Sequence, residues 1–286
     1  MDEPLVPVES IELAWTGIDH AEGLAVDADG TVWAGGEEGQ VYRGRLDEEP
    51  REIVRLPGRT LGFAVDGQGN AYCATISEPG LFRVTPEGDV ALISAGTPER
   101  RTAEPNYPAF LPSGFLLFSD SGTWGADDGC IFIVTPDGES RVADTSASRF
   151  PNGLAVLDGG RTLAVVESNL PGVSLLSVGK DGSLGDRRVL VQMPGTVPDG
   201  LALDARGRLL VSCWAPDAVF VLEPHGRLRL LVHDPHRFVL HEPTNIAFLP
   251  GTSRLVAANY GERFLSIFDH DTEGVPPPRP SFRWSG

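Results

Sequence analysis

The sequence predicts an all-β protein, a six-bladed β-propeller with four antiparallel strands in each blade. Three observations support this fold class. A motif of two apolar stretches joined by a glycine turn recurs along the chain, a second hairpin follows each copy, and no segment keeps a helical period of 3.6 residues. The composition agrees, because 34 Gly and 24 Pro among 286 residues provide many tight turns between short strands.

The first hairpin of the repeat has an apolar strand, a turn that ends in glycine and a second apolar strand. Apolar residues recur at every second position, as at Leu24 and Val26 before the first turn and at Val32 and Ala34 after it. The first five turns end at Gly30, Gly69, Gly114, Gly160 and Gly207. These glycines lie 39, 45, 46 and 47 residues apart, which is a spacing typical of propeller blades.

A second hairpin lies between successive copies of the first, with TPEG and TPDG turns at 85–88 and 135–138. Two hairpins make a four-stranded blade. A strand at about 10–15 precedes the first copy, and we expect it to pair with the sixth blade and leave no open edge. One domain is therefore expected over residues 1–286, with a proline-rich tail from about 275 to 286 that is extended or frayed. A pair of β-sandwiches is the alternative fold.

Charge and composition exclude several classes of protein. With 23 Lys+Arg against 40 Asp+Glu, the formal charge is −17, which disfavours nucleic acid and anionic membrane as partners. The acidic first ten residues do not resemble a signal peptide, and no apolar run has the length of a membrane-spanning helix. Cys73, Cys130 and Cys213 are far apart, which disfavours a disulfide framework or a thiolate zinc site. We expect a cytoplasmic protein that acts on a small molecule, and the sequence does not indicate its oligomeric state.

Polar residues recur at one position of the repeat, eight residues before the turn glycine. They are Glu22, Asn106, Asn152 and Asp199, whereas the second copy has Leu61. Asn245 takes the same place in the sixth copy if its turn is one residue shorter. Because equivalent positions of the blades lie at the same radius and height, these side chains should converge where the innermost strands begin.

Two carboxylates and three amides directed at one axis need partners. A buried unpaired polar group costs about 1–3 kcal/mol, and an unpaired carboxylate costs more. An all-oxygen ligand set favours a hard cation, Ca²⁺ first, with Mg²⁺ or Mn²⁺ as alternatives and Zn²⁺ less favoured. The other interpretation is a plug of hydrogen-bonded amides and water, or turn-forming residues after Pro105, Pro151 and Pro198.

The segments around these residues resemble the senescence-marker-protein/gluconolactonase (regucalcin-like) family. They read Glu-Gly at 22–23, Pro-Asn-Gly-Leu-Ala at 151–155, Pro-Asp-Gly-Leu-Ala at 198–202 and Pro-Thr-Asn at 243–245. The resemblance covers about 11–274. It implies a six-bladed propeller with a divalent ion, usually calcium, in its channel, and most members hydrolyse lactones. It also implies Glu22, Asn152 and Asp199 as metal ligands, with Asn106 as a further ligand or a substrate contact.

The resemblance implies that Asp199 takes part in the reaction. A divalent ion with an open position polarises an ester or lactone carbonyl and stabilises the oxyanion. Asp199 would act as general base for a water molecule or as the nucleophile, and the sequence leaves both roles open. Two alternatives to a hydrolase remain: a propeller that binds calcium or a ligand without turnover, and a related enzyme with a changed reaction on the retained metal site.

The substrate-binding segment departs from the family pattern. Sugar lactonases of the family have Arg-x-Asn-Asp, whereas this chain has Glu-Pro-Asn-Tyr at 104–107. A carboxylate replaces the guanidinium and an aromatic ring replaces the Asp. Together with Trp124, Phe150 and Trp214, this predicts a pocket more apolar than a sugar acid needs. The expected substrate contacts are Asn106, Glu104, Tyr107, Trp124, Asp120, His20 and Asn245.

Overall fold

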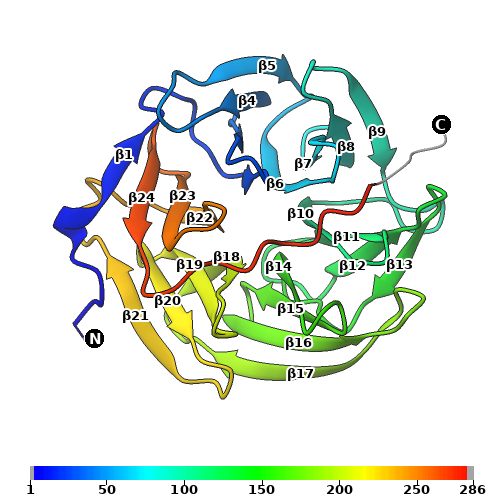
Figure 1. The fold of residues 1–286 in the computed structure, drawn as a ribbon. Helices are drawn as coiled ribbons and strands as arrows, with labels where there is room; N and C mark the ends of the chain where they lie inside the picture. The colour runs from blue at the N-terminus through cyan, green and yellow to red at the C-terminus, as the bar shows by residue number, and fades with distance from the viewer. Residues whose placement is uncertain (1–2, 282–286) are drawn as a thin grey trace.

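The computed structural model describes residues 3–281, and within them it shows six four-stranded antiparallel sheets arranged in a ring (Figure 1). Blade 1 contains β2 (Leu24–Val26), β3 (Val32–Gly35), β4 (Gln40–Gly44) and β5 (Arg51–Arg55). Blade 2 contains β6 (Thr60–Val65), β7 (Ala71–Thr75), β8 (Gly80–Val84) and β9 (Val90–Ser94). Blade 3 contains β10 (Pro105–Phe110), β11 (Leu116–Asp120), β12 (Cys130–Val134) and β13 (Ser140–Asp144).

The second half of the ring follows the same order. Blade 4 contains β14 (Pro151–Leu157), β15 (Thr162–Glu167), β16 (Gly172–Val178) and β17 (Leu184–Gln192). Blade 5 contains β18 (Val197–Leu203), β19 (Leu209–Ala215), β20 (Ala218–Leu222) and β21 (Leu228–His233). Blade 6 contains β22 (Pro243–Phe248), β23 (Arg254–Asn259) and β24 (Leu265–Asp269). The predicted fold class is confirmed.

The ring is closed by the N-terminal strand β1 (Glu12–Ala14), which follows a 3₁₀ turn at Val8–Ser10. This strand pairs antiparallel with β24, with Glu12 opposite Ile267 and Ala14 opposite Leu265, so that it is the outer strand of blade 6. The predicted closure is confirmed. It joins the two ends of the chain in one sheet and gives the last blade its fourth strand.

The hydrophobic core lies mainly between neighbouring blades. Trp33 of blade 1 packs in one cluster with Phe63 of blade 2. Tyr72 of blade 2 meets Phe110 of blade 3 edge to face, with ring centroids 5.0 Å apart. Aromatic pairs of this geometry add to the free energy gained by burial alone. Since each blade packs on both neighbours, the inner strands keep fixed positions around the channel.

The innermost strands of blades 2 to 6 each contain a β-bulge near their first residues. In blade 4, Pro151 is opposite Glu167 and Leu154 is opposite Val165, so that one residue is extra on β14. The same shift occurs in β6, β10, β18 and β22. Bulges redirect side chains and are frequent beside functional sites. In blades 3 to 5 the bulges lie at Asn106, Asn152 and Asp199, and we call these residues together with Glu22 of blade 1 the polar ring.

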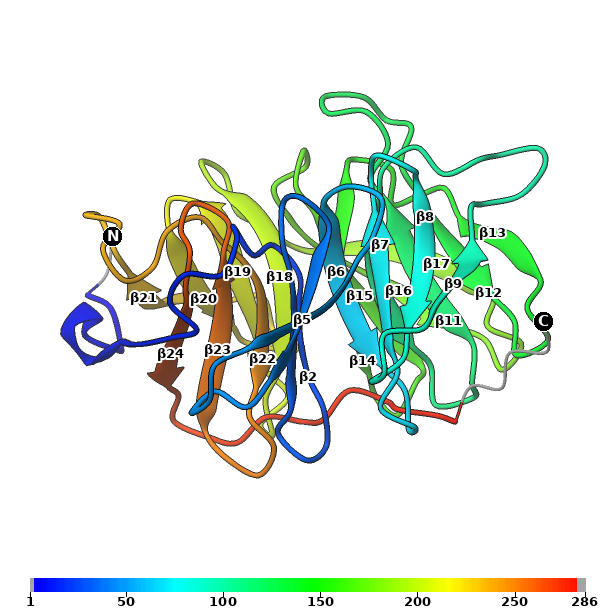
Figure 2. The ribbon, with the colours of Figure 1, turned by 90° about the horizontal axis from the view of Figure 1, so that it is seen from above.

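The tail crosses the opposite end of the channel as an extended strap, which we define as residues 274–281 (Figures 1 and 2). Val275 N–H donates to the Leu203 carbonyl at 2.8 Å, at the end of β18. The Arg279 guanidinium donates to the Val26 carbonyl at 2.5 Å, at the end of β2. The tail is thus extended and is bonded to two blades at Val275 and Arg279, and residues 282–286 of the predicted tail lie outside the described residues.

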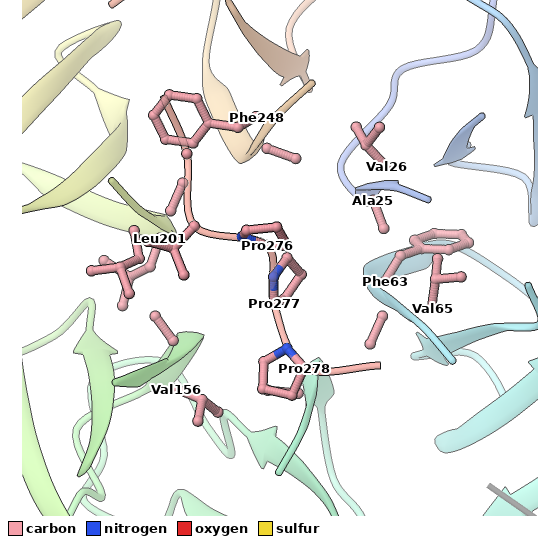
Figure 3. Close-up of a pocket in the computed structure, with 18 of the residues that line it drawn as sticks. Ala25, Val26, Phe63, Val65, Val156, Leu201, Phe248, Pro276, Pro277 and Pro278 are labelled. Carbon is pink, nitrogen blue, oxygen red and sulfur yellow. The ribbon is translucent and has the colours of Figure 1, made fainter. Parts of the chain in front are cut away.

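The strap closes an apolar cavity of about 120 Å³. Pro276, Pro277 and Pro278 pass between the inner strands, with Phe63 and Leu201 on the cavity wall (Figure 3). Water and polar ligands therefore reach the channel from its other end, where the innermost strands begin. Among residues 3–281, no helix has the length and apolar character needed to cross a lipid bilayer.

Candidate metal centre and substrate pocket

A pocket of about 330 Å³ opens at the end of the channel where the innermost strands begin. Its wall is formed by Glu22, Arg59, Glu104, Asn106, Trp124, Phe150, Asn152, Ser168, Val197, Asp199, Trp214, Thr244 and Tyr260. The four residues implied as metal ligands all lie on this wall. They come from four different blades and from positions separated by up to 177 residues in sequence. The bulges and the packing of the blades bring them together.

Glycines after the ring positions allow neighbouring blades to approach closely. A Cβ atom placed at Gly153 would lie 2.4 Å from the carbonyl oxygen of Asp199, and one at Gly200 would lie 2.6 Å from that of Thr244. Neither distance is compatible with a side chain. Since neither glycine has a positive φ, the reason for glycine here is contact rather than backbone conformation. The Asn-Gly and Asp-Gly pairs of the repeat are therefore explained by packing between blades.

Hydroxyl groups hold the backbone of the ring in place. The Ser119 hydroxyl of blade 3 donates to the Asn152 carbonyl of blade 4 at 2.8 Å. The Ser168 hydroxyl of blade 4 donates to the Pro198 carbonyl of blade 5 at 2.7 Å. These bonds give two buried carbonyls a partner across the boundary between blades. The first residues of β14 and β18 are thus each held by a side chain of the preceding blade.

The ring leaves buried oxygen atoms without partners. Asn152 Nδ2 donates to Asp199 Oδ2 at 3.2 Å. Within the described residues, Asn152 Oδ1 and Asp199 Oδ1 are both buried and accept no hydrogen bond. Orphaned buried acceptors are rare in folded proteins because each loses its hydration without compensation. Carboxylate and carboxamide oxygens are the ligands that Ca²⁺ prefers, and the residues present fit such an ion.

The two carboxyl groups resist ionisation in the absence of a cation. Burial raises the pKa of Glu22, the Asp199 charge raises it further, and the Arg59 guanidinium opposes these effects. Burial also raises the pKa of Asp199, and the hydrogen bond from the Asn152 amide opposes this effect. Like charges in a buried site suppress each other's ionisation, whereas a divalent cation favours both charged forms.

Arg59 is a pocket residue that the repeat pattern did not predict. Its guanidinium lies 3.6 Å from the Glu22 carboxylate and 3.5 Å from the Glu37 carboxylate, and it stacks 4.8 Å from the centre of the Tyr260 ring. It comes from blade 2, two residues before Leu61, the apolar member of the ring positions. The interruption of the polar pattern at Leu61 was the available signal, because another group must then occupy that side of the pocket.

In the sixth blade the ring position belongs to Thr244, which corrects the expectation for Asn245. Pro243 is opposite Asn259 and Ile246 is opposite Ala257, the same bulge that surrounds Asn152 in blade 4. Thr244 lines the pocket. The oxygen of the Asn245 side chain instead accepts the Leu24 N–H at 3.2 Å, so that this amide joins blade 6 to blade 1.

Three further predicted substrate contacts lie away from the pocket wall that the described residues form. Asp120 is buried, and its carboxylate accepts the N–H groups of Ala103 and Glu104 at 2.9 and 2.7 Å, so that it holds a loop. His20 pairs with Asp19 at 3.1 Å. Tyr107 is buried on the wall of the apolar cavity beneath the ring.

The aromatic and acidic predictions agree better with the structure. Glu104, Trp124, Phe150 and Trp214 all lie on the pocket wall. Burial raises the pKa of Glu104, and Arg59 partly offsets the effect. A carboxylate therefore does stand in the pocket near Asn106, as the Glu-Pro-Asn-Tyr segment predicts, and a guanidinium is supplied by a different blade.

A second group of potential ligands lies beside the strap. One oxygen of Asp204, one of Asp271 and one nitrogen of His270 lie within 4.8 Å of one another, so that the group is a candidate metal site by distance. However, the Arg208 guanidinium already contacts all three, with Nε 2.6 Å from Asp204 Oδ2. A cation therefore already compensates these carboxylates, whereas the buried oxygens of Asn152 and Asp199 have no such partner within the described residues.

The fold and the oxygen-rich ring define a propeller with its candidate site at one mouth of the central channel. Within that class the chain belongs to the SMP-30/gluconolactonase/LRE-like family, which matches residues 91–256. No curated protein matches the sequence significantly.

Several solved structures share the fold. A gluconolactonase from Xanthomonas campestris is 21% identical, with a TM-score of 0.78 over 94% of this chain and 95% of that one. A calcium-binding protein, regucalcin from Agrobacterium tumefaciens, is 20% identical, with a TM-score of 0.79 over 99% and 100%. Virginiamycin B lyase from Staphylococcus aureus is 14% identical, with a TM-score of 0.61 over 92% and 89%. At these identities the likeness concerns the fold alone.

Proposed function

We propose that this protein is a divalent-metal-dependent hydrolase, with calcium as its ion and a lactone or related ester as its substrate. The observation that carries the proposal is the pair of buried, unpartnered oxygens of Asn152 and Asp199 within the described residues, beside the Glu22 carboxylate in an accessible pocket. The family membership supports it, as do the similar folds of a gluconolactonase and of a calcium-binding regucalcin.

Glu22, Asn152 and Asp199 would hold the ion, with Asn106 as a further ligand or as a contact to the substrate. A bound divalent ion would polarise the substrate carbonyl and stabilise the oxyanion that develops during attack. The carboxylate of Glu22 and the amide oxygen of Asn152 would compensate the charge of the ion. The wall beneath the ring is apolar, which limits water to the pocket side.

Asp199 is the candidate catalytic residue. One of its oxygens is fixed by Asn152, and the other has no partner within the described residues. As a general base it would accept a proton from the attacking water. As a nucleophile it would attack the carbonyl carbon and displace the ester or lactone oxygen, and water would then hydrolyse the resulting anhydride and regenerate the carboxylate. A bound divalent ion would favour the ionised carboxylate, which is the form that either role requires.

Elemental analysis of the purified protein tests the metal, and a lactone and aryl-ester panel with and without chelator tests the reaction. We expect about one calcium per chain and hydrolysis that chelator abolishes and added calcium restores. Protein without metal and without hydrolysis would contradict the proposal and favour a binding propeller. Bound metal without hydrolysis would favour a changed reaction on the same site.

A changed reaction is the second candidate, and two observations favour it. Glu104 stands where sugar lactonases of the family have an arginine, and a lyase from Staphylococcus aureus has a similar fold. The metal centre would be kept in this case. Product analysis by mass spectrometry distinguishes the two, because hydrolysis adds the mass of one water to the substrate.

A further inference from the structure

Two large aromatic side chains are exposed at the pocket. Trp124 has 58% of its surface exposed and Trp214 has 38%, and both lie on the pocket wall. Indole rings in open water are unfavourable for stability, since apolar surface is better buried. Their position at a concave polar site indicates that a ligand covers them.

A third aromatic side chain, that of Phe150, supports Trp124. Phe150 contacts Trp124 edge to face, with ring centroids 4.8 Å apart. Its φ of +58° lies in the left-handed region, which is unusual for a bulky residue and is enriched at functional sites. The Phe150 carbonyl accepts the Ser168 N–H at 3.0 Å, which helps to hold this conformation. We call Trp124, Phe150 and Trp214 the aromatic wall.

The charges in the pocket provide no free cation for an anionic substrate. A divalent ion would neutralise Glu22 and Asp199. Among the described residues of the wall, Arg59 is the only cationic side chain, and it lies near the carboxylates of Glu22 and Glu37. Glu104 adds a further acidic group. A carboxylate or phosphate on the substrate would therefore meet repulsion rather than a partner.

We infer that the substrate is a neutral lactone or ester that carries an aromatic or branched apolar group, and that the aromatic wall binds this group. The inference rests on the proposed function and specifies its substrate class. The carbonyl of such a substrate would lie at the ring, and its apolar group would cover Trp124 and Trp214. Aromatic rings stack or meet edge to face with such walls, whereas a polyhydroxylated sugar lactone would leave its hydroxyl groups without partners there.

The first test compares γ-phenyl-γ-butyrolactone with glucono-δ-lactone. We expect wild-type protein to have the larger kcat/KM for the phenyl lactone. Trp124→Ala should raise KM for the phenyl lactone about tenfold with kcat changed less than about twofold, and Trp124→Phe should restore most of the loss. Phe238→Ala is the matched control, because Phe238 is 74% exposed but lies outside the pocket wall, and it should change neither constant.

The second test does not depend on turnover. Isothermal titration measures binding of 5-phenyl-2-pyrrolidinone, a lactam that resists hydrolysis, to calcium-loaded protein. Binding that Trp124→Ala and Trp214→Ala each weaken about tenfold supports the inference even if no lactone is hydrolysed, and only the proposed hydrolysis then fails. If lactones are hydrolysed but the lactam does not bind and Trp124→Ala has no effect, the inference is overturned and the hydrolase remains.

Discussion

At the residue scale, the position of Asp199 depends on a glycine of the neighbouring blade. A Cβ atom at Gly153 would lie 2.4 Å from the Asp199 carbonyl oxygen, so blades 4 and 5 would have to separate. We predict that Gly153→Ala weakens calcium binding at least about tenfold, because a displaced ligand loses charge-assisted contact with the ion. Calcium titration followed by isothermal calorimetry measures the effect.

Gly185→Ala is the matched control for this substitution. Gly185 lies in the outer strand β17, has ordinary space for a Cβ atom, 3.6 Å from the Ser177 hydroxyl oxygen, and has no positive φ. It should leave calcium affinity unchanged. Equal calcium affinities of wild-type protein and the Gly153→Ala variant would contradict the proposed role of blade contact in positioning the ring.

Replacing Asp199 by Asn tests the catalytic role of Asp199 in a protein that still folds. The amide has nearly the same size and still fits beside Asn152, but it neither accepts a proton nor attacks a carbonyl. We predict that Asp199→Asn lowers kcat by about 10²–10⁴ at saturating calcium, with an unchanged circular dichroism spectrum. Activity near the wild-type level would remove Asp199 from the chemistry.

Glu22→Gln provides a comparison for that experiment. Glu22 is the second carboxylate of the ring, and we expect its loss to weaken calcium binding strongly while high calcium recovers turnover. Added calcium should therefore restore the activity of the Glu22→Gln variant, which lacks a metal ligand, but not that of the Asp199→Asn variant, which lacks the reacting group. Unchanged metal content in the Glu22→Gln variant would mean that the ring is not the metal centre.

The sequence predicted the ring better than the rest of the pocket. Glu22, Asn106, Asn152 and Asp199 share one repeat position, and positions that share a register converge by symmetry. Arg59 precedes that position and lies in a blade whose ring residue is apolar, so the repeat shows at Leu61 that a polar group is missing but does not show which residue replaces it. The assignment of Asn245 was wrong by one residue, because a bulge adds a residue that only the pairing of β22 with β23 reveals.

At the element scale, the strap connects blades that are distant in sequence. Beyond the Val275 and Arg279 bonds to blades 5 and 1, the Pro280 carbonyl accepts the Gly67 N–H of blade 2 at 3.0 Å. The strap also covers the apolar cavity beneath the ring (Figure 3). Nothing in its Pro-rich sequence specified this path, since an extended segment without side-chain periodicity fits many surfaces.

Removal of the strap should destabilise the protein without removing the metal centre. Three hydrogen bonds and the apolar cover are lost when the chain ends at residue 273. With about 1 kcal/mol for each bond, we predict that Tm falls by on the order of 5 °C or more. Calcium affinity at 25 °C should stay within about twofold, because the ring lies at the other end of the channel.

Removal of residues 282–286 alone is the control for this truncation, because it deletes none of the contacts described for the strap. Its Tm should equal that of the full chain. If the chain that ends at residue 273 melts at the same temperature as the full chain, the strap contributes nothing to stability. Increased binding of a fluorescent hydrophobic dye by the shorter chain would report the opened cavity.

Strand pattern and blade closure were predictable for the same physical reason. Each hairpin buries alternate residues, which fixes its register, and β1 has no partner other than the edge of blade 6 in a closed ring. The contacts between blades were not predictable, because they depend on which carbonyl meets which glycine or hydroxyl. Those contacts hold the polar residues of the pocket in position.

At the scale of the whole molecule, the acidic ring couples stability to pH. The folded pKa values of Glu22 and Asp199 are raised above their unfolded values by burial, and for Glu22 also by the Asp199 charge. Between the unfolded and folded pKa values, the metal-free native state binds more protons than the unfolded state. Its stability therefore falls as the pH rises from about 4 into the neutral range.

Calcium at the proposed site should reverse this dependence, because it would bind the ionised carboxylates of the native state. We predict that protein kept metal-free by a chelator has a Tm on the order of 5 °C higher at pH 5.5 than at pH 8. Saturating calcium should raise Tm more at pH 8 than at pH 5.5. Scanning calorimetry at both pH values measures these Tm differences.

The formal charge of −17 also lowers stability at high pH, so a control must separate this effect from that of the two carboxylates. The Glu22→Gln/Asp199→Asn variant is that control. It should lose the calcium effect and most of the difference in Tm between the two pH values. Equal stabilisation by calcium at both pH values would show that the ion does not bind these two carboxylates.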